Sequence, residues 1–155
     1  MRKTFIAAAT AAAMLFTTGA AAQSVDAAFP TSLVDALQEM GYRAKLETDS
    51  AGDPKIRSTA DGSNYIIYFY GCQDNINCTG VNFSVGFDLA AGSTFEKMNE
   101  WNRTKLVGTA FLDNEGDPRL NYFVVLRNGI SRNTFERVVA RWEFALNEYK
   151  AHVGF

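Results

Sequence analysis

Residues 81 to 89 alternate strictly between apolar side chains and small or polar ones. Every second position is apolar, and the positions between them hold Asn82, Ser84, Gly86 and Asp88. This period of two is typical of a β-strand that buries one face. The run from Tyr65 to Tyr70 is apolar on both faces, which predicts a neighbouring strand in the centre of a sheet. The core of this chain is therefore expected to form on a β-sheet.

Shorter runs of the same kind predict four further strands, at residues 42–47, 55–59, 108–112 and 120–126. The connections between neighbouring strands are of hairpin length and contain turn residues, such as Asp61-Gly62 and Asn128-Gly129. Hairpin connections imply a largely antiparallel sheet. We find no internal repeat and no low-complexity segment.

Apolar residues at helical spacing predict three helices. The first begins at Thr31 or Ser32 and ends at Gly41, the second opens with Ser93 and Glu96 in capping-box spacing, and the third runs from Ser131 or Asn133 to Tyr149. The element order is then α-β4-α-β2-α. We expect a two-layer α+β domain, with a sheet of five to six strands covered on one side by three helices.

The first 22 residues have the composition of a signal peptide. Arg2 and Lys3 precede an uncharged apolar run, and Ala20-Ala21-Ala22 supplies the small residues of a cleavage site. A retained anchor helix is the alternative, but the run is shorter than the about 20 residues that a membrane span needs. We therefore expect cleavage after Ala22, a linker at 23–30, one domain at 31–155 and a periplasmic or secreted protein. No later segment is long and apolar enough to predict a membrane span in the mature chain.

Cys72 and Cys78 are the only cysteines, and they lie between the two clearest strands. In an oxidising compartment an even number of cysteines at this spacing predicts a disulfide across the connection. A redox role is the less favoured interpretation, because five residues separate them and a reactive thiol needs a base or a cation nearby.

Little in the chain is typical of an enzyme. His152 is the only histidine, and the sequence contains neither a glycine-rich phosphate loop nor a Gly-x-Ser-x-Gly elbow. The acidic stretch Asp113–Asp117 resembles a calcium loop, but the sixth position is Pro118 rather than glycine, so a hairpin turn is favoured. A net charge of −2 is unlike that of nucleic-acid-binding domains. We expect no catalytic residues, no metal, no cofactor and no nucleic acid.

Two sets of surface residues could contact a partner. Arg43, Lys45, Lys55 and Arg57 would share the polar face of the first hairpin, where solvated charges that protect a sheet edge are the plainer interpretation. The second set combines a helical segment with aromatic residues of the central strand, and its members are Trp101, Asn102, Arg103, Tyr68 and Tyr70. Trp and Arg are common at protein interfaces, although Trp101 could equally belong to the core.

Three stretches resemble the YbjN family of bacterial sensory transduction regulators. They are Met98–Arg103, Gly108–Pro118 and Asn128–Ser131, the last leading into a final helix that carries Trp142. The resemblance covers roughly residues 31–149. It implies a fold similar to type III secretion chaperones, which are two-layer α+β domains that often form dimers and bind protein segments. Four strands are predicted before the middle helix, where those chaperones have three.

The chain departs from the family pattern after the middle helix. Members often carry basic residues on both sides of the glycine in the next strand, whereas Leu106-Val107-Gly108-Thr109 is uncharged in this chain. The resemblance brings no catalytic residues with it.

Together these observations predict an exported, non-enzymatic binding or regulatory protein that recognises a protein or peptide partner, like a chaperone or adaptor. The expected surface is the sheet face or a groove between helix and sheet. The alternative is a periplasmic sensor of a small ligand or of envelope stress, with an aromatic-lined pocket. Homodimerisation is implied by the resemblance alone.

Overall fold

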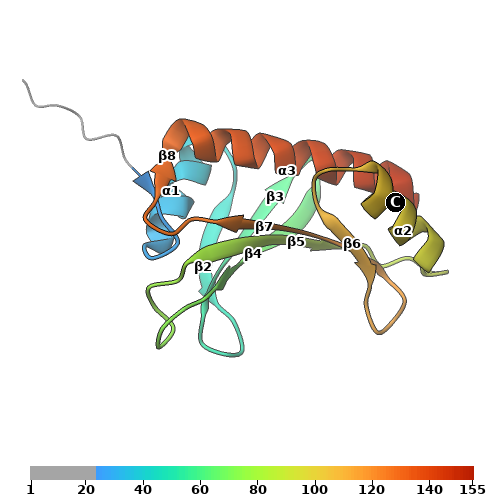
Figure 1. The fold of residues 1–155 in the computed structure, drawn as a ribbon, viewed down its shortest axis with the longest axis horizontal. Coiled ribbons are helices and arrows are strands. Elements are labelled where there is room, and N and C mark those ends of the chain that lie inside the picture. Colours follow the sequence, from blue (N-terminus) through green and yellow to red (C-terminus); the bar gives the residue numbers. More distant parts are fainter. Residues whose placement is uncertain (1–23) are drawn as a thin grey trace, which may run out of the picture.

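A six-stranded antiparallel sheet forms the centre of the computed structural model, which describes residues 24–155 (Figure 1). Its strands lie side by side in the order β2-β3-β4-β5-β7-β6. Their bounds are β2 Ala44–Thr48, β3 Pro54–Ala60, β4 Ser63–Tyr70, β5 Gly80–Gly86, β6 Thr109–Leu112 and β7 Pro118–Val125. The strand pairs β2-β3, β3-β4 and β6-β7 are consecutive hairpins, which confirms the antiparallel prediction.

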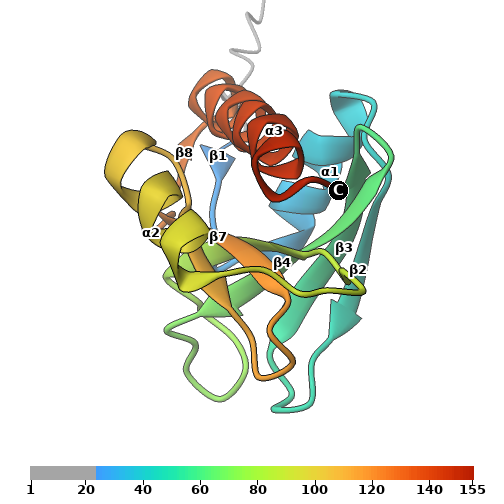
Figure 2. The same ribbon diagram turned by 90° about the vertical axis from the view of Figure 1, so that its right-hand side faces the viewer.

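Three helices lie on one side of this sheet (Figures 1 and 2). The long helix α3, Arg132–Val153, runs across the sheet, with α1, Pro30–Glu39, on one side of it and α2, Phe95–Thr104, on the other. The order α-β4-α-β2-α and the α+β class are therefore as predicted. No helix of the described residues covers the opposite side of the sheet, which we call the open face.

Aromatic side chains of the sheet and α3 fill the core between the two layers. Tyr65 on β4 and Phe83 on β5 each lie 5.6 Å, centroid to centroid, from the Trp142 ring of α3. All three are almost fully buried. Burial raises the pKa of Tyr65 to about 12, so its phenol stays neutral in the core. The alternation within β4 and β5 thus points one set of side chains to α3 and the other to the open face.

The segment expected to be a linker takes part in the fold. Ser24–Val25 form β1, which pairs with β8, Ile130–Ser131, in a second, two-stranded sheet. Val25 and Ala27 are completely buried. Two residues are too short a run for period-two alternation to reveal, which is why the pattern indicated a linker. The division of the chain at residue 31 stays a prediction, and the predicted signal peptide at 1–22 lies outside the described residues.

The helix ends differ from the predicted ones by a few residues. The N-cap of α1 is Phe29, followed by Pro30 at the first helical position, and the N-cap of α2 is Thr94, whose hydroxyl accepts from the Lys97 N–H. At α2, Ser93 and Thr94 can cap equally well, so composition could not choose between them, and at α1 no Ser or Thr side chain caps the helix. Helix α3 begins after Ser131, as predicted, and continues to Val153, because Gly154 in the left-handed conformation ends it.

Two hairpins share a six-residue motif, Asp-x-x-Gly-Asp-Pro, that the sequence analysis did not identify as a repeat. It occupies residues 49–54 between β2 and β3 and residues 113–118 between β6 and β7. In both turns the first aspartate accepts hydrogen bonds from the N–H two and four residues later, at 2.8–3.0 Å. A helix precedes each hairpin, so α1-β2-β3 and α2-β6-β7 are related units at opposite edges of the sheet.

Cys72 and Cys78 form a disulfide in the loop between β4 and β5, as predicted. Asn75 in the same loop donates hydrogen bonds to the Asp53 carboxylate at 2.8 Å and to the Ala51 carbonyl at 3.2 Å. The disulfide loop is thereby attached to the β2–β3 turn, and both project away from α3 (Figure 1). Among the described residues, no helix has the length and apolar character needed to cross a membrane.

Candidate functional site

The Trp-Asn-Arg segment of α2 has a largely structural role. The Trp101 side chain is 1 % exposed and packs edge-on against Tyr149 of α3, with 4.9 Å between ring centroids. Its indole N–H donates to the Gly108 carbonyl at 3.3 Å. Gly108 has φ +83°, and a Cβ there would lie 2.7 Å from the Leu120 side chain, so both conformation and space require glycine. Trp101 is therefore a core residue, although its edge also borders the groove described below.

Asn102 attaches α2 to the edge of the sheet. Its amide donates to the Ala110 carbonyl at 3.0 Å, and its carbonyl accepts from the Ala110 N–H at 2.8 Å. These two bonds occupy backbone groups of β6 that no further strand pairs with, since β6 is an edge strand. Arg103 is exposed. Of the three neighbouring residues, only Arg103 has a side chain that the fold leaves available.

A groove of about 550 Å³ lies between α3 and the end of α2. Its apolar lining is Trp101, Leu106, Val107, Ala140, Phe144 and Ala145. Leu106 is fully exposed and Phe144 is 64 % exposed, so the groove has large apolar side chains that nothing in the described part of the domain covers. We call this site the α2–α3 groove.

The charges around the groove are unbalanced. Lys105 forms an ion pair with Glu148 at 3.0 Å, and its ammonium lies 5.7 Å from the centre of the Trp101 ring. Arg137 and Arg141 also line the groove. Arg137 donates to the Asn133 side chain at 3.1 Å, and neither arginine has an ion-pair partner among residues 24–155. The site thus combines apolar surface with two uncompensated positive charges.

Sequence reasoning did not find this groove. Phe144 lies outside the apolar stripe of the last helix, which consists of Phe135, Val138, Val139, Trp142, Ala145, Leu146 and Tyr149. A large apolar residue outside that stripe was an available signal of an exposed apolar site. Leu106 entered the sequence analysis as part of an uncharged stretch after the middle helix, and the structure places it in the loop that follows the end of α2 at Thr104. Arg137 and Arg141 could not be placed beside them without the packing of α3 against α2.

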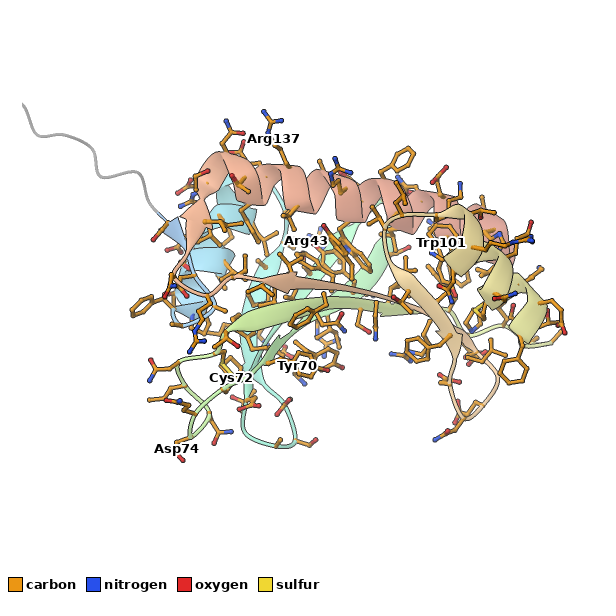
Figure 3. The ribbon with its side chains drawn as sticks, viewed as in Figure 1. Arg43, Tyr70, Cys72, Asp74, Trp101 and Arg137 are labelled. Carbon is orange, nitrogen blue, oxygen red and sulfur yellow. A yellow bond between two sulfur atoms is a disulfide. The ribbon has the colours of Figure 1, made fainter. Side chains whose placement is uncertain are left out.

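Tyr68 and Tyr70 alternate with the buried residues of β4 and so lie on the open face. Figure 3 shows Tyr70 on the opposite side of the sheet from Trp101. The candidate contacts therefore divide between two surfaces. Tyr70 is half exposed, and its ring is 6.3 Å from that of Phe123 on β7. Phe123 and Val125 are themselves more than half exposed. The open face is thus a second surface with uncovered apolar side chains.

Some of the charged residues considered as candidates form ion pairs within the fold. Hydrogen bonds from Arg57 and Lys45 lower the pKa of Glu47, which forms ion pairs with both of these cations on the first hairpin. Backbone hydrogen bonds from Asp117 and Glu115 and the Arg119 guanidinium lower the pKa of Asp113. In the described part of the chain, no group of three or more His, Cys, Asp or Glu residues could hold a metal ion.

Two tyrosines on the helical side also keep their protons. Burial and a hydrogen bond to Glu143 at 2.9 Å raise the pKa of Tyr42 to about 12. Burial also raises the pKa of Tyr149, whose hydroxyl donates to the Arg119 carbonyl at 3.0 Å. His152 lies 2.8 Å from the Lys97 carbonyl and beside the Trp101 ring. These groups hold α3 in place.

Comparison with known proteins identifies the family. The model of the YbjN family, described as "Putative bacterial sensory transduction regulator", matches residues 29–155. No curated protein matches the chain. The match extends from α1 to the last residue and includes both hairpin motifs and the Trp-Asn-Arg segment. This chain belongs to the YbjN family.

Proposed function

We propose that this protein is an exported, non-enzymatic binding protein whose α2–α3 groove holds an acidic, amphipathic segment of a partner protein. The observation that carries the proposal is the exposure of Leu106 and Phe144 beside Arg137 and Arg141. A regulatory role agrees with the description of the family. The disulfide supports an oxidising compartment, where such bonds persist.

The chemistry of the groove defines the segment that would fit it. Covering Leu106 and Phe144 with apolar residues would contribute about 1.5–3 kcal/mol for each side chain fully buried. Carboxylates at the edge of the segment would pair with Arg137 and Arg141 and speed association. A basic segment would place like charges together, so the groove discriminates by charge as well as by shape.

Site-specific photo-cross-linking tests this assignment. A photoreactive phenylalanine derivative is placed at Phe144 in the mature protein, and a matched control carries it at Phe29, which is 65 % exposed but lies away from the groove. We expect cross-links from position 144 to a periplasmic protein, at a segment with apolar and acidic residues, and none to that segment from position 29.

The same experiment separates the other occupants. Cross-links only between two copies of this chain would make the groove a dimer interface and would contradict a separate partner. Cross-links of equal yield from both positions, or to segments without acidic residues, would also contradict the proposal.

A further inference from the structure

The open face contains a trough along β5. The positions of β5 on this face are Gly80, Asn82, Ser84 and Gly86, which carry no side chain or a small polar one. Large side chains stand on both sides, with Tyr68 and Tyr70 on β4 and Arg119, Asn121 and Phe123 on β7. Within this trough, a hollow of about 470 Å³ is lined by Tyr70, Asn82, Thr109, Asn121 and Phe123. We call it the amide hollow.

The polar groups of the amide hollow have no partners in the fold. Asn82 is 7 % exposed, yet its side chain forms no hydrogen bond with any residue from 24 to 155. Asn121 lies two residues along β7 from Phe123, the cross-strand partner of Asn82, and its side-chain oxygen is buried without a hydrogen-bond partner among those residues. Buried polar groups are normally satisfied, since an unpaired one costs on the order of 1–3 kcal/mol. The Asn121 oxygen is thus a buried acceptor without a partner, and the Asn82 amide, which also lines the hollow, has its hydrogen-bonding capacity unused within the described residues; together they indicate a ligand that supplies hydrogen bonds at this site.

The glycines of β5 shape the walls of this site. A Cβ at Gly80 would lie 2.7 Å from the Phe123 ring, and one at Gly86 would lie 2.7 Å from the Arg119 guanidinium. Phe123 therefore leans over β5 toward Tyr70 because position 80 has no side chain. The rings of Tyr70 and Phe123, whose centroids are 6.3 Å apart, therefore form an aromatic wall at one end of the hollow. The two asparagine side chains lie beside this wall.

We propose that the amide hollow binds a neutral saccharide. The lining carries no charge, which disfavours phosphates, nucleotides and charged amino acids. Asn82 and Asn121 each offer a donor and an acceptor, which match sugar hydroxyls that both donate and accept. The exposed faces of Tyr70 and Phe123 match the apolar C–H faces of a pyranose ring.

A peptide strand fits this site less well. The backbone groups of β4, β5 and β7 are already paired with one another, so a peptide could not add to the sheet at this point. Saccharide recognition goes beyond the proposed function, because it uses the opposite face of the sheet from the α2–α3 groove. The two sites would let one domain connect a glycan to a protein partner.

The test is an NMR titration of the mature protein with three uncharged probes and one control peptide. The probes are trimers of N-acetylglucosamine, of β-1,4-linked glucose and of α-1,4-linked glucose, and the control is trialanine with blocked ends. We expect at least one saccharide to shift the side-chain NH₂ signals of Asn82 and Asn121 without shifting those of the groove. Phe123→Ala and Asn121→Ala should each weaken binding by about tenfold or more.

Two further variants keep the result interpretable. Gly80→Ala should displace Phe123 and weaken saccharide binding while the domain stays folded, and Phe144→Ala in the groove should leave binding unchanged. If none of the three saccharides shifts the two amides, or if only trialanine does, the proposal is wrong. Unchanged affinity in Phe123→Ala would also overturn it.

Discussion

The ammonium of Lys105 lies 3.0 Å from the Glu148 carboxylate, at the point where the end of α2 meets α3. This ion pair joins the two helices that form the groove. Because the pair is internally neutral, the net charge that the groove offers to a partner comes from Arg137 and Arg141. Changing either Lys105 or Glu148 should therefore alter the affinity for the partner segment moderately and leave the groove itself in place.

Opposite single changes to this pair should have opposite effects. Glu148→Gln leaves Lys105 uncompensated and should strengthen binding of an acidic segment, whereas Lys105→Gln leaves Glu148 uncompensated and should weaken it. Each effect should be roughly 0.5 kcal/mol, or about twofold in Kd, because both side chains are partly solvated. Titration calorimetry at low and high salt measures both. Effects of the same sign would show that the pair acts through structure and not through charge.

Neighbouring residues of the Trp-Asn-Arg segment should differ greatly in their effect on stability. Trp101→Ala removes a buried ring and its hydrogen bond to Gly108 and should lower the free energy of unfolding by about 3–5 kcal/mol. Arg103→Ala, at an exposed position, should change it by less than about 0.5 kcal/mol. Urea unfolding of both variants measures the difference. Equal stabilities would contradict the assignment of Trp101 to the core.

Removing the disulfide should cost stability and leave recognition intact. In the chain-entropy model, replacing Cys72 and Cys78 with serine lowers the free energy of unfolding by about 2 kcal/mol. The loop lies on the far side of the sheet from the α2–α3 groove, so the Kd for the partner segment should not change. A folded double mutant that no longer binds would restore a redox role for the pair.

Asp113 should make stability depend on pH in the acid range. Its pKa is lowered in the folded state, so its contribution is present above the unfolded pKa of about 3.9 and is lost as the pH falls through the folded pKa. Asp113→Asn keeps the acceptor oxygen but removes the charge. The variant should be less stable than wild type at neutral pH, and the two should converge toward about pH 2. Urea midpoints across this range test it, and a difference that stays constant with pH would show that the Asp113 charge is not the cause.

The sequence predicted the layers of this fold because each strand and helix carries its own periodicity. Val81 to Leu89 and the stripe on the last helix could be assigned from spacing alone. Helix ends such as Thr94 depended on a choice between adjacent capping residues, which spacing does not decide. The repeated Asp-x-x-Gly-Asp-Pro turn was visible in the sequence, but only the hydrogen bonds of Asp49 and Asp113 show that the two copies are equivalent.

The functional surfaces were less predictable, since they depend on packing between distant segments. Tyr68 and Tyr70 were predicted as possible partner contacts, but their neighbour on the open face, Phe123, comes from a strand about fifty residues further on. The groove combines residues of α2, the following loop and α3, and its defining property is the exposure of Phe144 and Leu106. Exposure of this kind is set by the tertiary structure.

Charge reversal in the groove tests the central claim most directly. The measurement is the Kd for the partner segment identified by cross-linking from position 144, for wild type and for Arg137→Glu with Arg141→Glu. The matched control reverses two arginines elsewhere on the surface, Arg43→Glu with Arg127→Glu, so that both variants carry the same net charge. We predict that the groove variant binds at least about tenfold more weakly, with unchanged thermal stability, and that the control binds within about twofold of wild type. Equal weakening in both variants, or none in either, would contradict recognition by the α2–α3 groove.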